Sequence, residues 1–177
     1  SPPRPPKQVH EWSIGIYQGV KPWLVEPPEN VSNPVLTHRD VTDVRAAFVA
    51  DPFMLKVADN WYMFFEVMNR ESRKGEIGLA TSEDGFSWQY RQIVMSEPFH
   101  LSYPYVFRWS DDYYMIPESW KAGAVRLYRA DRFPDRWTCV ANLIENPYLA
   151  DSSVFFKDGY WWMFSENGLD FTFDTLR

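Results

Sequence analysis

The stretch DPFMLKVADNWYMFFE, residues 51–66, decides the fold of this chain because related stretches occur three times. The second copy is YPYVFRWSDDYYMIPE, residues 103–118, and the third is DSSVFFKDGYWWMFSE, residues 151–166. The three align without a gap, and each closes on a glutamate. Their starts lie 52 and then 48 residues apart. Self-similarity at a period of about 50 residues is typical of propellers and solenoids.

Each copy predicts a β-hairpin. Aromatic and β-branched residues on both halves of the copy suit a pleated, half-buried surface. Between the halves lie turn-forming residues, namely Ala58-Asp59-Asn60, Ser110-Asp111-Asp112 and Lys157-Asp158-Gly159. A hairpin folded about these turns brings its two ends together. We therefore expect three neighbouring pairs on one face of a ring: Asp51 with Glu66, Tyr103 with Glu118, and Asp151 with Glu166.

Two further strands follow each of the first two copies. They are predicted at 76–81 and 88–95, and then at 124–130 and 137–144, with Trp88 and Trp137 at corresponding places. Four antiparallel strands per repeat make one propeller blade. Helical periodicity is absent. The predicted fold class is therefore all-β, a β-propeller of which this chain holds about two and a half blades.

The repeats also predict the organisation of the chain. Residues 1–8 form a Pro-rich tail or linker, because proline lacks the backbone N–H that regular structure needs. Residues 9–50 form a leader, with a short strand at 12–17 that would close the ring and a loop from 22 to 34. The blades occupy 51–177, divided into 51–102, 103–150 and a partial blade at 151–177. An open ring exposes sheet edges, so either the natural chain continues past Arg177 or another chain completes the ring. We favour the first.

Composition narrows the function. The net charge of −6 and the pI near 5.1 argue against nucleic acid as a partner. No apolar run predicts a membrane span. The single cysteine, Cys139, excludes an internal disulfide, and with the lack of a signal-peptide pattern it favours the cytoplasm. We expect no cofactor and no metal, since His10, His38 and His100 lack metal-ligand spacing. Aromatic residues are 18% of the chain; they fill the space between sheets or line a sugar-binding groove.

The carboxylates carry the chemical prediction. Glycoside cleavage needs one carboxylic acid to protonate the leaving oxygen and one carboxylate as base or nucleophile. Crowding raises the pKa of one carboxyl above its neighbours, which separates acid from base. The structural alternatives stay open: an Asp before Pro often caps a turn, and a glutamate recurring in each repeat can tie blades together. The candidates are Asp51, Asp151, Glu66, Glu118 and Glu166.

An Asp-Pro pair opening the first blade, followed by a hairpin ending in aromatic residues, resembles the five-bladed propellers of the arabinanase, xylosidase and invertase group of glycoside hydrolases, the family 43-like superfamily. The resemblance implies five blades in the complete protein. It also implies that Asp51 is the general base or nucleophile and that Asp151 tunes pKa and holds substrate. The general acid of that group would come from a blade beyond Arg177. Asp151-Ser152 departs from the Asp-Pro expected there.

The runs WSIGIY, NPVLTHRDVTD, FVADPFM, YPYVF and YYMIPES more closely resemble the propeller domain that precedes the transferase domain of glucosamine inositolphosphorylceramide transferases. This likeness covers most of residues 12–166. It implies a covalently linked transferase domain, and a propeller that binds or positions a glycan without cleaving it.

We therefore expect a carbohydrate-active propeller that binds a glycoside at the channel mouth. Whether it is an enzyme stays open: it would be a glycosidase, part of a glycosyltransferase, or a non-catalytic glycan-binding module. A protein-interaction propeller is disfavoured. Besides the catalytic candidates Asp51 and Asp151, Glu118 is the leading sugar ligand, with Glu66 and Glu166 beside it. Phe53, Tyr103 and Tyr105 are expected in the wall of the site, and Trp61 in the core.

Overall fold

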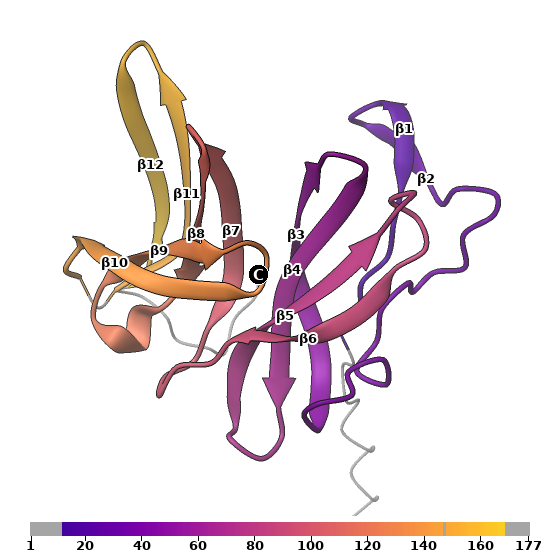
Figure 1. Cartoon of the computed structure of the whole chain (residues 1–177), viewed down its shortest axis with the longest axis horizontal. Coiled ribbons are helices and arrows are strands. Elements are labelled where there is room, and N and C mark those ends of the chain that lie inside the picture. Colours follow the sequence, from indigo (N-terminus) through magenta and orange to yellow (C-terminus); the bar gives the residue numbers. More distant parts are fainter. Residues whose placement is uncertain (1–11, 147, 169–177) are drawn as a thin grey trace, which may run out of the picture.

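The computed structural model describes residues 12–146 and 148–168 of the chain. Within them every regular element is a β-strand, apart from one 3-10 turn, η1 (Trp120–Ala122). Figure 1 shows two four-stranded sheets side by side, with a separate two-stranded hairpin next to the second sheet. The predicted all-β class is confirmed.

The strands pair with their neighbours in chain order, which is the arrangement of a propeller blade. The first sheet contains β3 (Ala46–Val57), β4 (Asn60–Asn69), β5 (Lys74–Ser82) and β6 (Gln89–Met95). The second contains β7 (Ser102–Trp109), β8 (Asp112–Glu118), β9 (Val125–Arg132) and β10 (Arg136–Ile144). The third unit contains β11 (Leu149–Lys157) and β12 (Tyr160–Asn167). The described part therefore holds two complete blades and the inner hairpin of a third.

The three predicted hairpins are present in matching register. The closing glutamates pair with the residue before each predicted start, as Ala50 with Glu66, Ser102 with Glu118, and Ala150 with Glu166. Asp158 and Gly159 both have positive φ, as a two-residue hairpin turn with the twist of its strands requires. The expected neighbouring of the hairpin ends is thus confirmed.

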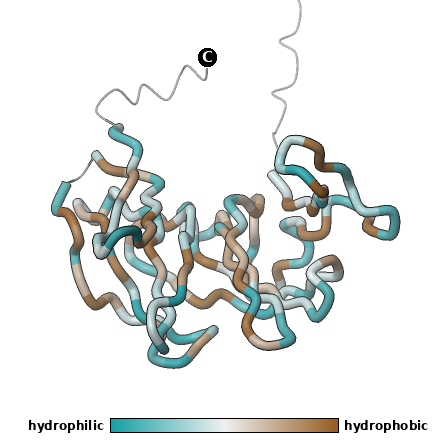
Figure 2. The backbone as a smooth tube through the Cα atoms, turned by 90° about the horizontal axis from the view of Figure 1, so that it is seen from above, coloured by the Kyte–Doolittle hydropathy of each residue, from teal (hydrophilic) through white to brown (hydrophobic). Residues whose placement is uncertain are grey.

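The core lies between successive sheets. Phe64 of β4 is fully buried and meets Trp137 of the second sheet edge to face, with ring centroids 5.5 Å apart. Phe133 of the same sheet adds contacts to Phe64 and, at 4.9 Å, to Tyr62. Figure 2 shows brown apolar stretches alternating with teal polar stretches along the strands. The aromatic residues of the first two units therefore pack mainly between the sheets.

Two features of the leader differ from those predicted from the sequence. Residues 12–17 form no strand: Ile14 makes a single bridge to Leu36. Instead, a short exposed hairpin of β1 (Gln18–Lys21) and β2 (Leu24–Glu26) lies where the loop was expected. Pro22 occupies its turn, where a missing N–H does not break a ladder. Because the side chains of both strands are exposed, they show no inside-outside alternation that sequence could reveal.

The expected tail at 1–8, His10 and the last residues of the partial blade, 169–177, lie outside the described residues. The domain boundaries stay a prediction. In the part of the chain that the structure describes, no helix has the length and apolar character to cross a membrane.

Candidate functional site

The same backbone irregularity occurs in the innermost strand of all three units. Asp51, Tyr103 and Asp151 have φ values of 53°, 43° and 49°, and the pairing register shifts at each of them. A left-handed backbone is uncommon for residues other than glycine, and it persists where the surrounding structure imposes it. Such bulges redirect a side chain out of the regular alternation. Asp51 lies six residues inside β3, not at the entrance of the strand, because the bulge lets the strand continue through it.

The bulges bring the three inner strands together at one end. The backbone N–H of Tyr103 donates to Oδ2 of Asp51 at 3.3 Å. The phenol of Tyr103 and the hydroxyl of Ser153 share a hydrogen bond of 3.1 Å. These contacts connect β3 to β7 and β7 to β11. We call the end of the inner strands that carries Asp51, Glu66, Glu118 and Asp151 the mouth.

Glu66 is the most perturbed carboxyl of the mouth. It lies on β4 and is only 6% exposed. Burial is the main cause of its raised pKa, and the nearby charges of Asp51, Glu118 and Asp151 add to it, which brings the pKa to about 8. At neutral pH Glu66 is therefore mostly a protonated, neutral acid.

His100 lies beside Glu66, with its Nε2 3.4 Å from Oε1 of the glutamate. The backbone N–H of Gly75 donates to Nδ1 of His100 at 2.8 Å. Burial, together with the charge of Lys121, lowers the pKa of His100. The imidazole is therefore neutral, and because Nδ1 accepts a hydrogen bond, its proton is on Nε2.

Glu118 is buried in the equivalent place of the second unit. Burial raises its pKa, and Asp151 contributes in the same direction, to about 7. Hydrogen bonds from the backbone N–H of Trp120 at 2.7 Å and from the hydroxyl of Ser102 at 3.1 Å offset part of this rise. η1 begins at Trp120, two residues after Glu118, and supplies the first of these donors.

The two aspartates are half-buried, and burial raises the pKa of both. The hydrogen bond from Tyr103 partly offsets this rise at Asp51. At Asp151 the charges of Asp51 and Glu166 raise the pKa further. Glu166 itself is exposed on β12. Asp51, Glu66, Glu118 and Asp151 thus influence one another electrostatically across three successive units.

A pocket of about 410 Å³ opens beside Asp51 and Glu66. Trp12, from the leader, lines it and is 62% exposed. An exposed indole beside carboxylates is the combination that sugar-binding sites use, since the ring face contacts the apolar face of a pyranose while the carboxylates accept its hydroxyl protons. Ile14, Phe48 and Pro52 also line the pocket.

The predicted wall residues connect the inner strands instead of lining this pocket. Phe53 contacts Tyr103 and Tyr105 edge to face, with ring centroids 4.7 Å and 5.7 Å apart. The phenol of Tyr105 donates to the carbonyl oxygen of Val154 at 2.5 Å. Trp61 is half-buried near the hairpin turn, with Nζ of Lys56 5.6 Å from its ring centroid, so it lies at the opposite end of β4 from Glu66.

Sequence reasoning did not assign Trp12 or the hydrogen-bond donors around Glu118. Trp12 belongs to a run that was expected to be a strand, and only the folded chain brings it to the pocket. His100 lies three residues before the second repeat copy, and this spacing was the only signal that it would reach the mouth. In residues 12–146 and 148–168, no group of three or more His, Cys, Asp or Glu side chains has an arrangement that could hold a metal ion.

The comparisons identify the family. Residues 6–175 match the family described as "Glucosamine inositolphosphorylceramide transferase 1, N-terminal". This chain belongs to that family. The rice protein named glucosamine inositolphosphorylceramide transferase 1 (Oryza sativa subsp. japonica) is 40% identical over 176 residues, covering 91% of this chain and 23% of the rice protein. The chain therefore spans about a quarter of the length of this relative.

Solved glycoside hydrolases share the fold of this family member. A putative glycoside hydrolase from Bacteroides ovatus ATCC 8483 is similar with a TM-score of 0.62 at 18% identity, over 81% of this chain and 54% of that chain. The GH32 beta-fructofuranosidase of Bombyx mori is similar with a TM-score of 0.56 at 17% identity, over 80% of this chain and 33% of that chain. At these identities the likeness shows the fold alone. Both resemblances expected from the sequence are confirmed.

Proposed function

We propose that this chain binds a carbohydrate or glycoconjugate at the mouth. The observation that carries the proposal is the convergence of four carboxyl groups from three successive repeats, two of which, Asp51 and Glu66, line a pocket with an exposed tryptophan. Isolated structural carboxylates are paired with cations or backbone N–H groups. Asp51 and Glu118 each accept one backbone N–H, but burial and the neighbouring carboxyls still raise the pKa of Glu66, Glu118 and Asp151, which is unfavourable for folding and typical of functional sites.

The charge of the mouth favours an amino sugar. The mouth carries four carboxyl groups, and Lys121 is a cation near them whose charge lowers the pKa of Glu118. A protonated amine on the ligand would offset the excess of acid. The name of the rice relative contains glucosamine, which is an amino sugar. We propose a ligand of this class, bound by the propeller part of a longer protein that also contains a transferase domain.

Calorimetric titration with chitotetraose prepared in fully deacetylated and fully N-acetylated forms tests this proposal. We expect tighter binding of the deacetylated form. The double variant Asp51→Asn/Asp151→Asn removes two charges from the mouth and is expected to weaken binding at least tenfold, equivalent to about 1.4 kcal/mol.

The matched control is Asp59→Asn, at the exposed hairpin turn opposite the mouth. It removes a charge of the same kind and should leave binding unchanged. Equal weakening by Asp59→Asn would indicate general electrostatic attraction and would contradict a site at the mouth.

Glycoside hydrolysis is the second candidate, supported by the different pKa values of the carboxyls. Glu66, with a pKa of about 8, keeps its proton at neutral pH. Burial raises the pKa of Asp51 as well, but from the lower ordinary value of an aspartate, and the hydrogen bond from Tyr103 offsets part of the rise. One retained acid and one ionised base are the pair that glycosidases use. In this proposal Asp51 is the general base and Asp151 the group that tunes its pKa, while Glu118 and Glu166 contact the sugar.

A panel of aryl glycosides separates the two candidates. Turnover by the wild-type protein, lost in a folded Asp51→Asn variant, would support hydrolysis. Glycan binding without turnover on any member of the panel would support the non-catalytic module.

A further inference from the structure

The pair formed by His100, from the loop between the first two blades, and Glu66, from the first blade, is held by backbone contacts on β5. Gly75 N–H donates to Nδ1 of His100, and Leu101 N–H donates to the carbonyl oxygen of Gly75 at 3.0 Å. The imidazole is therefore held on one side by the backbone of β5. Its other nitrogen, Nε2, faces Oε1 of Glu66.

Gly75 has no room for a side chain. A Cβ atom there would lie 2.1 Å from the carbonyl oxygen of Leu101, 2.8 Å from Oε1 of Glu66 and 2.9 Å from Cε1 of His100. Real Cβ contacts are essentially never shorter than 3.0 Å. Glycine is thus required here because the Glu66–His100 pair closes directly over the backbone of β5.

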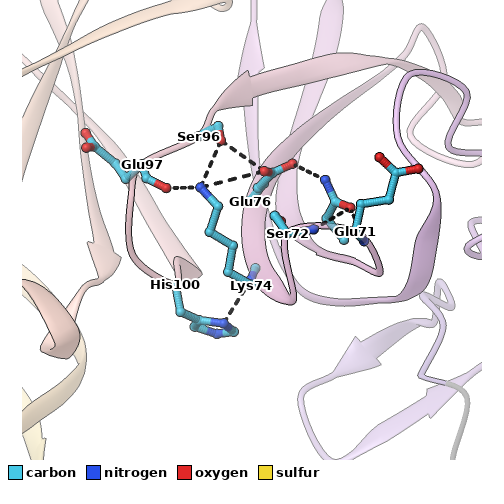
Figure 3. Close-up of polar contacts among 9 residues, drawn as sticks. Glu71, Ser72, Lys74, Glu76, Ser96, Glu97 and His100 are labelled. Carbon is cyan, nitrogen blue, oxygen red and sulfur yellow. Dashed lines mark hydrogen bonds and ion pairs between the residues drawn. The ribbon is translucent and has the colours of Figure 1, made fainter.

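A polar network fixes the segment that carries His100 (Figure 3). Nζ of Lys74 donates to Oγ of Ser96 at 3.3 Å and to the carbonyl oxygen of Glu97. Glu76 accepts a hydrogen bond from Ser96 at 2.9 Å and lies 3.9 Å from Nζ of Lys74. These contacts join the start of β5 to residues 96–100, so the loop between the first two blades is anchored at both ends.

We propose that His100 is a positioning residue for Glu66: its Nε2–H faces Oε1 at 3.4 Å and favours the ionisable proton on Oε2, so that Glu66 donates a hydrogen bond to the glycan at the mouth. The inference rests on the proposed function for the ligand, but its geometric part concerns the free protein. Oε1, which faces the Nε2–H of His100, is the less favourable oxygen for the proton. A neutral acid with a fixed proton is a directional donor, which a mobile carboxyl is not.

The other charged groups around the pair shift the pKa values of Glu66 and His100. Asp51 on β3, Glu118 on β8 and Asp151 on β11 each raise the pKa of Glu66, as its burial does. Lys121 on η1 acts on His100 and lowers its pKa. Both effects keep Glu66 and His100 neutral together, which is the state that the tautomer argument requires.

Nuclear magnetic resonance on the free protein tests the inference without any glycan. The ¹⁵N spectrum of the imidazole of His100 reports its tautomer, and the side-chain ¹³C resonance of Glu66, assigned by its loss in Glu66→Gln, reports the pKa. We expect an Nε2–H tautomer across neutral pH. In His100→Leu the donor is lost, and the pKa of Glu66 should rise by about half a unit to one unit.

His100→Gln is the conservative variant, because its amide can accept from Gly75 and donate to Glu66, and it should keep the pKa of Glu66 near the wild-type value. His38→Leu, which removes a histidine of the leader, is the matched control and should leave the titration unchanged. An Nδ1–H tautomer in the wild-type protein would overturn the inference. So would a Glu66 titration that is identical in the wild type and His100→Leu.

The glycan experiment then separates the two proposals. Absence of binding by the wild type with the expected tautomer would reject the proposed function and keep the Glu66–His100 geometry. Binding that His100→Leu weakens and His100→Gln restores would support both.

Discussion

In the residues that the structure describes, the two junctions between successive units are covered by different parts of the following unit. At the first, between the sheets β3–β6 and β7–β10, Phe133 of the turn between β9 and β10 and Trp137 of β10 cover Phe64. At the second, between β7–β10 and the hairpin β11–β12, the place of Phe64 in the repeat is taken by Ile116. Ile116 lines an apolar pocket of about 430 Å³, together with Leu127 and Leu143.

The comparison indicates that the inner and outer strands have different roles: the inner strands carry the site, and the outer strands carry residues that pack between units. Trp88 and Trp137 occupy the same place in the first two units, and each donates its indole N–H to a carbonyl oxygen of the preceding turn, at 3.0 Å from Gly85 and 2.8 Å from Pro134. All four carboxyls of the mouth lie on the inner hairpins β3–β4, β7–β8 and β11–β12. The outer strands of the next unit supply the aromatic residues that fill the junction.

The largest expected effect tests this filling directly. Phe64→Ala should lower the free energy of unfolding by about 3–5 kcal/mol, because it opens a cavity in a closely packed junction. Ile116→Ala should cost about 2 kcal/mol, near the lower end for a buried isoleucine, because its surroundings already contain the pocket. Urea denaturation of both variants measures the difference. An equal loss in the two variants would contradict the comparison.

The second expected effect is a change of stability with pH, caused by the buried glutamates Glu66 and Glu118. Their pKa values in the folded state are raised to about 8 for Glu66 and about 7 for Glu118, above the ordinary 4.5. A raised carboxyl pKa contributes stability below the unfolded value, and this contribution is lost as pH rises through the folded value. The free energy of unfolding should therefore fall between pH 5 and pH 8.

Replacing either glutamate with glutamine should flatten this fall. Glu66→Gln should make the protein more stable than the wild type at pH 8, by roughly 2–4 kcal/mol, and Glu118→Gln should act over the lower range, up to about pH 7. Denaturation at pH 5, 6, 7 and 8 measures both. Glu83→Gln, at an exposed turn, is the control; a profile that Glu66→Gln leaves unchanged would count against the burial of an uncompensated acid.

A smaller effect is expected from two glycines. Gly75→Ala at the first junction would force the loop at Leu101 to move, and we expect a loss of about 2–3 kcal/mol, the upper part of the range for overpacking. Gly123 has open space around it and a φ of 74°, so Gly123→Ala should cost only the left-handed strain of about 1 kcal/mol. Thermal unfolding compares them. A larger loss in Gly123→Ala would show that the close approach at Gly75 is not limiting.

The smallest effect is a gain. Leu143→Phe adds aromatic surface to the open pocket of the second junction. Cavity-filling substitutions commonly stabilise by about 0.5–2 kcal/mol, and we expect the lower end, since Leu143 is partly exposed. Val140→Phe, on the same strand and also exposed, is the matched control. A similar gain in both would mean that hydrophobicity at the surface, not filling of the junction, is responsible.

The hairpins and the blade order could be predicted from the sequence because they follow from a repeat with period-2 patterning and turn residues at fixed places. The pairs Asp51–Glu66 and Tyr103–Glu118 follow from the same geometry. The bulges could not be predicted, since Asp and Tyr give no local signal for a left-handed backbone. Neither could the short hairpin β1–β2, whose exposed side chains show no alternation.

The residues of the site also fall into those that the sequence could predict and those that it could not. Its carboxyls were found because the closing glutamate recurs in all three copies of the repeat and the opening aspartate in two of them, whereas its surroundings come from parts of the chain that do not recur. Trp12 reaches the pocket from the leader. Tyr148 stands where the repeat would place a second His100, and it is half exposed, so the imidazole partner belongs to Glu66 and not to Glu118.

The left-handed positions at Asp51, Tyr103 and Asp151 have a consequence for how such a site can change. An acid and a phenol already occupy one backbone conformation in neighbouring units of the same chain. The conformation is imposed by the strands on either side, so the residue there is exchangeable without a shift in the pairing that follows it. Each unit thus offers one interchangeable position at the mouth, and a propeller of this kind can acquire a new specificity by point substitution at these positions while its blades stay the same.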